Sequence, residues 1–236
     1  MRKLHVITRT AGRPNFFKVC HSSITQQTYP HINHIVIVDD ADTDEARQAQ
    51  VPWHAGNQYV DDYTDIEKIN VKFNDYGHFE PFLNAAIDTI PDEDYFCILD
   101  DDDFYTHPGA LSQAMESIGN YDILFWKVRA AGGIVPSRGF FRNNLPYGQI
   151  SMIGWIVKKA FIGNHRFKPM YGGDHAFIAD ITNNNVRTSN IGWVDLLLST
   201  TNSSRPQGEG HCRDILLEHA ITGFKAGSTG YNYDIV

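Results

Sequence analysis

The first half of the chain alternates short apolar runs with segments in which apolar residues recur at helical spacing. Four apolar runs have the length of buried strands, and they cover residues 4–8, 35–38, 69–73 and 95–99. Three segments between them are expected to be helical, and they cover residues 15–25, 42–50 and 79–89. Apolar strands joined by helices are typical of βαβ units in a parallel sheet. The pattern therefore predicts an α/β fold with a mainly parallel sheet.

The second half of the chain has a less regular pattern. The expected elements there are a helix over residues 108–118, a strand over 123–128, mixed strands and loops over 132–148, a helix over 174–183, strands over 186–191 and 194–200, and a helix around 215–219. Irregular aromatic segments after an α/β half commonly form a binding wall for a second substrate, although aromatic residues are more often part of the core.

Four consecutive carboxylates, Asp100 to Asp103, directly follow the apolar run over residues 95–99. Ligands of open α/β sheets bind outside the carboxyl ends of the strands, where this run ends. In an extended chain Asp100 and Asp102 would lie on one face, and Asp101 and Asp103 on the other. Two interpretations are open. The run is either a solvated acidic turn or a site for a hard cation such as Mg²⁺ or Mn²⁺, which takes carboxylate, phosphate and water oxygens.

Three other places carry candidate site residues, each with an ordinary structural alternative. Asp39 and Asp40 end the second apolar run, where they either cap the next segment or hydrogen-bond a nucleoside base or ribose. Asp174 follows two glycines at the start of a predicted helix, where it is either the N-cap or a catalytic base. His211 ends a polar loop and is either an ordinary loop histidine or an imidazole ligand folded over a bound nucleotide.

Composition and charge narrow the possible classes of protein. A length of 236 residues with 42% apolar residues fits one large folded domain. The net charge of −8 disfavours nucleic acid as the main partner, because that binding depends on Lys and Arg. No apolar run is long enough to cross a membrane, and the first residues read as a strand rather than a signal peptide. The widely spaced Cys20, Cys97 and Cys212 are expected to be reduced thiols, so we expect a cytoplasmic protein.

Three stretches of the sequence resemble glycosyltransferases of the GT-A fold, and in particular the large family 2 of inverting enzymes. IVIVDDADTDE is similar to the family's strand that ends in Asp, and NDYGHFEPFLNAAID is similar to its Asn-containing helix. YFCILDDDDFYTHPGAL resembles its metal-binding Asp-x-Asp signature, followed here by Pro108 and Leu111. The resemblance spans about residues 3–180. It implies an α/β, GT-A (Rossmann-like) fold with a mixed, mainly parallel central sheet flanked by helices.

The same resemblance implies a single domain over residues 1–236. Residues 1–105 would bind the nucleotide sugar, and residues 106–236 would bind the acceptor and supply a C-terminal lid. Leu83 stands where many family members have Arg. The Gln/Arg-x-x-Arg-Trp motif and the membrane spans of processive synthases are absent, which favours a single transfer to a soluble or surface-bound acceptor.

The resemblance also implies roles for individual residues. Asp100 and Asp102 would hold Mn²⁺ or Mg²⁺ on the donor diphosphate, and His211 would complete the metal shell. Asp39 would contact the base or ribose, and Asp103 would support the site or contact the sugar. The residues implied to bind substrate or nucleotide are Thr8, Arg9, Asp39, Asp40, Asn84, Asp100, Asp101 and Asp103.

The reaction implied is the metal-dependent transfer of a sugar from a nucleotide-diphosphate sugar to an acceptor hydroxyl. The metal would neutralise the leaving diphosphate. Asp174 would take the proton of the hydroxyl, and a single displacement of this kind inverts the sugar's configuration. The possible acceptors are a glycan, a lipid-linked sugar, a protein and a modified nucleobase.

Two other functions remain open. A nucleotidyltransferase acting on a sugar phosphate also holds Mg²⁺ with acids at strand ends. It usually has a Gly-rich basic loop after its first strand, and residues 9–14 match such a loop only weakly. A non-catalytic carbohydrate-binding module with a GT-A-like fold is the second alternative. Loss of Asp102 or Asp174 would have favoured the module, and both positions are acidic here.

Overall fold

The computed structural model describes most of the first 201 residues. The described ranges are 2–10, 14–39, 57–71, 80–130, 133–137, 148–170, 172–184 and 190–201. The helices expected over residues 42–50 and 215–219 lie outside these ranges, as do Asp40 and His211. Asp39 is described in its backbone only.

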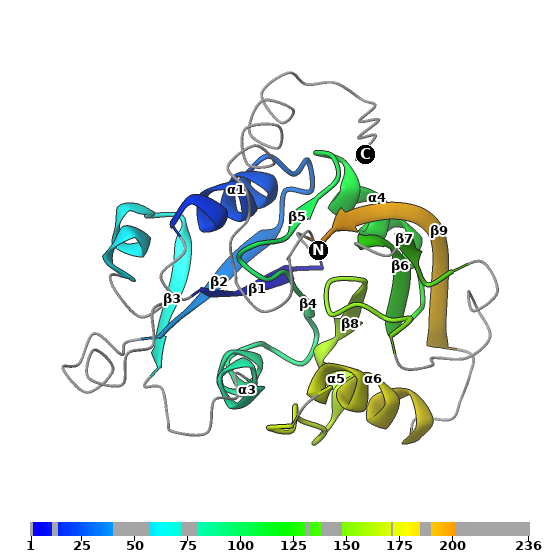
Figure 1. The fold of residues 1–236 in the computed structure, drawn as a ribbon. Helices are drawn as coiled ribbons and strands as arrows, with labels where there is room; N and C mark the ends of the chain where they lie inside the picture. Colours follow the sequence, from blue (N-terminus) through cyan, green and yellow to red (C-terminus); the bar gives the residue numbers. More distant parts are fainter. Residues whose placement is uncertain are drawn as a thin grey trace.

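A single mixed sheet of nine strands organises the described chain (Figure 1). The strands are β1 (Leu4–Thr10), β2 (Ile32–Asp39), β3 (Ile66–Val71), β4 (Tyr95–Ile98), β5 (Phe104–Tyr105), β6 (Ile123–Ala130), β7 (Gly133–Val135), β8 (Trp155–Lys158) and β9 (Ile191–Thr200). The helices are α1 (Pro14–Thr25), α3 (Glu80–Asp88), α4 (Ala110–Ser117), α5 (Lys159–Ile162) and α6 (Gly173–Asn184), with a 3₁₀ helix η1 (Asn57–Asp62).

The strand order places the first strand in the interior of the sheet. The order is β3-β2-β1-β4-β8-β6-β9-β5, and β7 pairs with β6. Strands β3, β2, β1 and β4 run parallel, whereas β8 lies antiparallel between β4 and β6. Strand β9 returns parallel to β6. The parallel half, with helices between its strands, confirms the α/β fold predicted from the alternating pattern.

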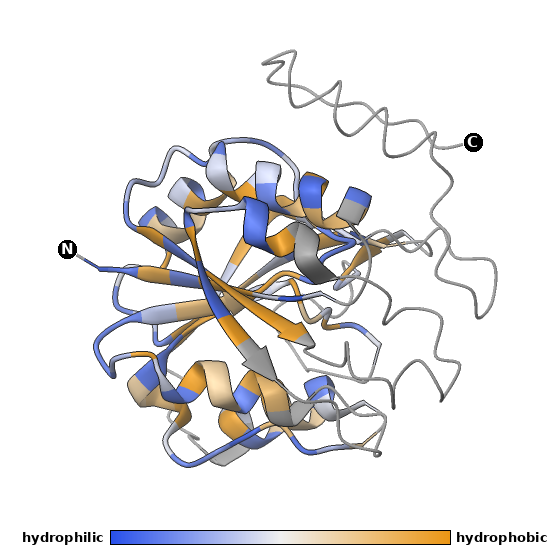
Figure 2. Cartoon of the chain, turned by 90° about the vertical axis from the view of Figure 1, so that its left-hand side faces the viewer, coloured by the Kyte–Doolittle hydropathy of each residue, from blue (hydrophilic) through white to orange (hydrophobic). Residues whose placement is uncertain are grey.

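Helices cover both faces of the sheet. Figure 1 shows α1 and α4 on one side, and α3, α5 and α6 on the other. Figure 2 shows the same two layers with largely hydrophobic strands between them. Neighbouring strand residues alternate between two cores, because successive side chains point to opposite faces. Val6 and Cys97 pack in the core under α1 and α4, whereas Ile7 and Ile98 pack in the core over α3 and α6.

Two predictions for the second half were wrong in detail. Strand β8 and helix α5 were not predicted, because β8 has only four residues and depends on β4 and β6 for its burial. The strand expected over 194–200 begins earlier, at Ile191, and most of the strand expected over 186–191 lies outside the described residues. The strand contains Gly192, and a larger residue would not fit there because its Cβ would lie 2.4 Å from the Tyr121 ring.

Candidate functional site

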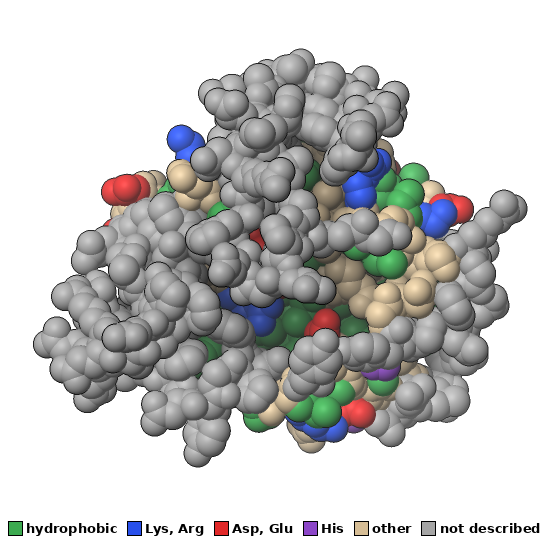
Figure 3. All heavy atoms as spheres, viewed as in Figure 1, with side chains coloured by type: hydrophobic (Ala, Val, Ile, Leu, Met, Phe, Trp, Pro, Cys, Tyr) green, Lys and Arg blue, Asp and Glu red, His purple; other side chains and the backbone are tan. Residues whose placement is uncertain are grey.

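The carboxyl ends of β1, β2 and β4 meet at one edge of the sheet. Ile7 of β1 lies beside Ile98 of β4, and Thr10 lies beside Val38 of β2. Ligands of such sheets bind outside this edge. Figure 3 shows acidic, basic and apolar side chains in a hollow near the centre of the face seen in Figure 1.

The four carboxylates after β4 form a tight turn, which we call the acidic turn (Asp100–Asp103). The N–H of Asp103 donates to the carbonyl of Asp100 at 2.9 Å, which closes a β-turn. The extended geometry expected through these residues was therefore wrong, because the strand ends at Ile98. The expected alternation persists in the exposures. Asp101 and Asp103 are buried, at 0% and 7% exposed, whereas Asp100 and Asp102 are partly exposed.

Arg9, the penultimate residue of β1, forms an ion pair with Asp100, the first carboxylate of the acidic turn. Its Nε donates to Oδ1 of Asp100 and its Nη2 to Oδ2, each at 2.8 Å. This is a bidentate guanidinium–carboxylate pair, which is stronger and more directional than a single hydrogen bond. The side chains of Arg9 and Asp100 are 21% and 22% exposed, so both remain within reach of a ligand.

Thr10 hydrogen-bonds Asp101, the second carboxylate of the acidic turn, on the opposite face of the sheet. Its hydroxyl donates to Oδ2 of Asp101 at 2.8 Å. Cys20 of α1 lies in the same interior. Burial raises the pKa of its thiol well above the ordinary value, and the nearby carboxylates raise this pKa further. Cys20 is therefore a protonated thiol and not a nucleophile at neutral pH.

Two residues predicted to bind substrate have partners inside the protein. Thr8 is fully buried, and its hydroxyl lies 2.9 Å from Nε2 of His34. The amide of Asn84 in α3 exchanges two hydrogen bonds of 2.9 Å with the backbone N–H and carbonyl of Phe167. A direct contact of Thr8 or Asn84 with substrate would require these bonds to break. Their binding roles stay predictions.

Asp174 lies in the first turn of α6 and is partly exposed. The carbonyl of Gly172 accepts the first helical bond from the N–H of Ala176 at 3.0 Å, so Gly172 is the cap residue and Asp174 lies inside the helix. Gly172 has a φ of +75°, a conformation that favours glycine. One turn later, Phe177 stacks on Phe167 with ring centres 4.0 Å apart, which anchors the start of α6.

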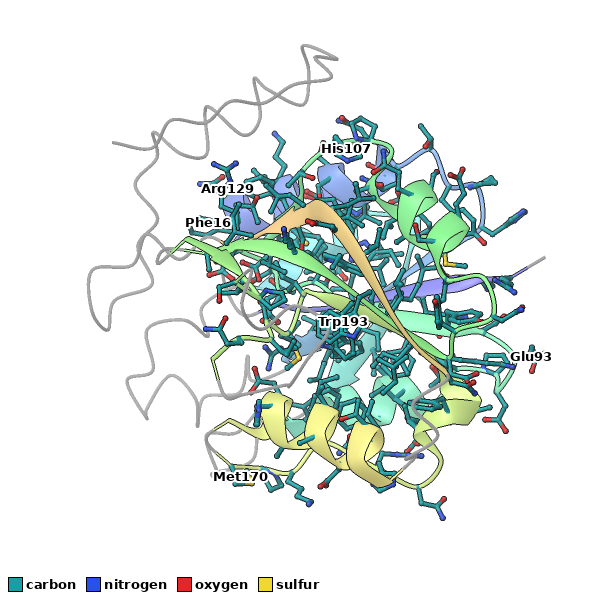
Figure 4. All side chains as sticks on the ribbon, turned by 90° about the vertical axis from the view of Figure 1, so that its right-hand side faces the viewer. Phe16, Glu93, His107, Arg129, Met170 and Trp193 are labelled. Atoms are coloured by element: carbon teal, nitrogen blue, oxygen red, sulfur yellow. The ribbon has the colours of Figure 1, made fainter. Side chains whose placement is uncertain are left out.

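Aromatic side chains fill the space between the sheet and α6. Trp193 of β9 is partly buried and stacks on Phe125 of β6, with ring centres 4.6 Å apart (Figure 4). Figure 4 places Met170 at the outer surface near α6, and it is 46% exposed. The aromatic residues described here are thus mainly core, the more ordinary of the two interpretations of the second half.

The chemistry of the acidic turn fits a divalent cation. Within the described ranges, no group of three or more His, Cys, Asp or Glu is arranged to hold a metal ion. Mg²⁺ needs no such cage, because it commonly takes one or two carboxylates and completes its shell with substrate phosphates and water. The partly exposed Asp100 and Asp102 supply two such carboxylates, and a cation bound to Asp100 would share its oxygens with Arg9. His211, the third predicted ligand, lies outside the described residues.

Comparison with known proteins identifies the family. The sequence profile of the family described as Glycosyl transferase family 2 matches residues 5–165. The chain therefore belongs to glycosyl transferase family 2, as the resemblance predicted. No curated protein is similar enough in sequence to count as a relative.

Solved structures share the fold. S. aureus TarS 1–349 in complex with UDP-GlcNAc is 16% identical, with a TM-score of 0.64, over 95% of this chain and 66% of that one. Mannosyltransferase PcManGT from Pyrobaculum calidifontis, in complex with GDP-Man and Mn²⁺, is 15% identical, with a TM-score of 0.60, over 88% and 59%. The chain spans 44% of the longer TarS structure. These likenesses confirm the predicted GT-A fold.

No helix in the described part of the chain is both long enough and apolar enough to span a membrane.

Proposed function

We propose that the protein transfers a sugar from a nucleotide-diphosphate sugar to an acceptor hydroxyl, with a divalent cation at the acidic turn. The observation that carries this proposal is the position of the acidic turn, in a family 2 chain, at the carboxyl edge of the parallel strands. The structural neighbours support the class of donor, because TarS was solved with UDP and UDP-GlcNAc, and PcManGT with GDP-Man and Mn²⁺.

Asp100 and Asp102 are the proposed protein ligands of the cation, since both are partly exposed at the turn. The cation would offset the charge that develops on the diphosphate as the glycosidic bond breaks. Asp101 is buried against Thr10 and supports the shape of the turn from beneath. Asp39, at the end of the neighbouring β2, is the proposed contact to the base or ribose.

Asp174 is the proposed catalytic base. The acceptor hydroxyl loses a proton as it attacks, and a carboxylate on the opposite side of the sugar from the leaving group takes that proton in an inverting displacement. Asp174 is partly exposed in a helix whose first turn is fixed by the packing of Phe177. A single transfer to a soluble or surface-bound acceptor is proposed, because the sequence motif of processive synthases is absent.

Thermal unfolding with a panel of donors tests the proposal. The panel contains UDP-GlcNAc, UDP-glucose, UDP-galactose and GDP-mannose, each with and without Mn²⁺. A donor at a hundredfold excess over its Kd stabilises the folded state by about 2.7 kcal/mol, which raises the melting temperature by roughly 5 to 10 °C for a chain of this size. We expect such a rise for one nucleotide class, and only with the metal.

Two results would contradict the proposal. The first is the absence of stabilisation by any nucleotide sugar in the presence of Mn²⁺. The second is stabilisation that requires a nucleoside triphosphate together with a sugar phosphate, which is the pattern expected of a nucleotidyltransferase. Transfer itself is then measured as release of the nucleoside diphosphate in the presence of candidate acceptors.

A further inference from the structure

Arg9 is a cation placed among the carboxylates that are proposed to hold a metal. Its guanidinium occupies both oxygens of Asp100 at 2.8 Å, and it comes from a different strand, 91 positions away in the chain. Both partners are about four-fifths buried, at 21% and 22% exposed. At that depth an ion pair is screened less by water than a surface pair is. The charge of Arg9 therefore acts strongly on anything that binds at the acidic turn.

We propose that Arg9 is a positioning residue that makes cation binding and donor binding at the acidic turn depend on each other. It orients Asp100 and offsets one negative charge, so that the turn binds a divalent cation weakly alone and well when a nucleotide diphosphate arrives with it. The inference rests on the proposed function, because it concerns the donor's diphosphate at the same site.

The electrostatic argument gives opposite signs for the two ligands. A divalent cation is attracted by the carboxylates of the acidic turn and repelled by the guanidinium of Arg9. A diphosphate has the opposite preferences, so it gains from the same guanidinium. Removing the positive charge should therefore strengthen the binding of the metal alone and weaken the binding of the nucleotide diphosphate. A purely structural role for Arg9 would weaken both.

The geometry adds a second, separable contribution. The planar guanidinium fixes both oxygens of Asp100 at once, whereas a lysine ammonium is a point charge and leaves the carboxylate free to rotate. On the other face, Thr10 donates a single hydrogen bond to one oxygen of Asp101, at 2.8 Å. Two adjacent residues of β1 thus hold two adjacent residues of the turn. Substitutions that keep either the charge or the hydrogen bond can separate the two effects.

The chain offers a matched control pair. Arg166 donates through Nε and Nη2 to Oδ1 of Asp88, at 3.1 and 2.6 Å. Asp88 ends α3, which leads into the amino end of β4, so this pair lies toward the edge of the sheet opposite the acidic turn. Arg166→Gln removes the same charge from another arginine–carboxylate pair, which is more exposed, at 30% and 58%, and lies away from the proposed site.

The experiment is calorimetric titration of the full chain with Mn²⁺ alone, and with UDP and GDP in the presence and absence of Mn²⁺. Four proteins are compared: wild type, Arg9→Gln, Arg9→Lys and Arg166→Gln. Glutamine keeps a hydrogen-bond donor but no charge, and lysine keeps the charge but cannot form the bidentate pair with Asp100. Circular dichroism and melting temperature establish that each variant is folded.

We expect Arg9→Gln to bind Mn²⁺ alone about tenfold more tightly, and UDP or GDP with Mn²⁺ about tenfold more weakly, as expected for one charge a few ångströms away. Arg9→Lys should keep the wild-type affinity for Mn²⁺ alone and lose about threefold for the nucleotide, since only the geometry changes. Arg166→Gln should match wild type in every titration.

Unchanged or weaker binding of Mn²⁺ alone by Arg9→Gln would overturn the inference. If that variant does not fold, wild-type behaviour of Arg9→Lys toward the nucleotide, or its altered affinity for Mn²⁺ alone, would overturn it. If no nucleotide binds the wild-type protein with Mn²⁺, the proposed function fails instead, and the titrations with Mn²⁺ alone still decide whether Arg9 restrains cation binding.

Discussion

Strands β1 and β4 are linked by a pair of polar side chains at each end, and the two pairs differ in their surroundings. At the amino end, Nε2 of His5 lies 3.1 Å from Oδ2 of Asp94, and the side chains are 5% and 12% exposed. At the carboxyl end, Arg9 and Asp100 are 21% and 22% exposed. The same two neighbouring strands thus have one closed end and one end within reach of a ligand.

The closed end is completed by other protein groups. Nδ2 of Asn33 lies 3.3 Å from Nδ1 of His5, and it donates to Oε2 of Glu67 at 2.7 Å. A histidine that accepts at Nδ1 carries its proton at Nε2, where it donates to Asp94. Both ring nitrogens of His5 therefore have a partner within the protein. A buried histidine that is bonded at both ring nitrogens contributes to stability. At the other end, the partly exposed Arg9 and Asp100 belong to the proposed ligand site.

The largest difference between the two ends should appear in the activity of Asp102→Asn. The substitution removes a charge from the open end with little change in shape, so transfer should fall by about a hundredfold to a thousandfold while the melting temperature stays near the wild-type value. Release of nucleoside diphosphate and thermal unfolding measure the two quantities. Asp195→Asn, on the exposed side of β9, is the control and should keep full activity.

Full transfer activity in a folded Asp102→Asn protein would remove the assignment of this residue to the metal. The end of β1 and β4 with Arg9 and Asp100 would then be an exposed turn with no role in transfer, and the two ends would differ in exposure alone.

The closed end should show the reverse pattern. Asp94→Ala leaves His5 buried without its acceptor, which should lower the free energy of unfolding by about 3 kcal/mol. The apparent KM for the donor should stay within about twofold of wild type under conditions where the variant is folded, because Asp94 lies at the opposite end of the strands. Denaturant unfolding and steady-state kinetics measure the two effects.

The neighbouring Glu93 provides the matched control, since it is exposed and Figure 4 shows it at the surface. Glu93→Ala should change stability by less than about 0.5 kcal/mol. A donor KM raised tenfold in Asp94→Ala, with the fold intact, would mean that the two ends of the strands are coupled and that the comparison drawn here is wrong.

The sequence allowed the open end to be located but not its contacts. A buried apolar run before four carboxylates indicates a strand end at a ligand-binding edge, and the structure places the acidic turn at that edge. The pairing of Arg9 with Asp100 spans 91 positions and depends on β1 lying beside β4. No local pattern contains that information. A prediction of the strand order would have been the signal needed to find it.

The same limit explains the residues with unexpected partners. Asn84 bonds the backbone of Phe167, 83 positions away, and Thr8 bonds His34, 26 positions away. Both look in the sequence like polar residues available for a ligand, because their partners lie on other elements. Strand β8 went unpredicted for a related reason. Its four residues are a strand only because β4 and β6 lie on either side.

Between the two ends of β1, a buried chain of polar contacts runs inward from Asp65. Oδ1 of Asp65 lies 3.3 Å from Nε2 of His21, and the Nδ1 atoms of His21 and His34 are 3.1 Å apart. Nε2 of His34 lies 2.9 Å from the Thr8 hydroxyl, which lies 3.7 Å from Sγ of Cys20. One set of neutral tautomers satisfies every contact, with each group from Cys20 to His21 donating to the next and His21 donating to Asp65.

That chain predicts a smaller effect, on the pH dependence of stability. Burial, with a further contribution from His21, lowers the pKa of His34 from 6.5 to about 3. Between these values the unfolded chain binds a proton that folded His34 does not, so stability falls as the pH drops below about 6.5, by roughly 1.4 kcal/mol per pH unit. At pH 5 the loss due to His34 is about 2 kcal/mol relative to pH 7.5.

Denaturant unfolding of wild type and His34→Gln between pH 7.5 and 5 measures this loss as a difference. Carboxylates respond in both proteins and cancel in the difference. His21, whose pKa burial also lowers, contacts His34 directly, so the difference reports His34 together with its effect on His21. Wild type should lose about 2 kcal/mol more than the variant over this range. Parallel pH profiles would mean that His34 is readily protonated in the folded state. In that case the middle of β1 would be open to water, and the closed part of the strand would be limited to the pair of His5 and Asp94.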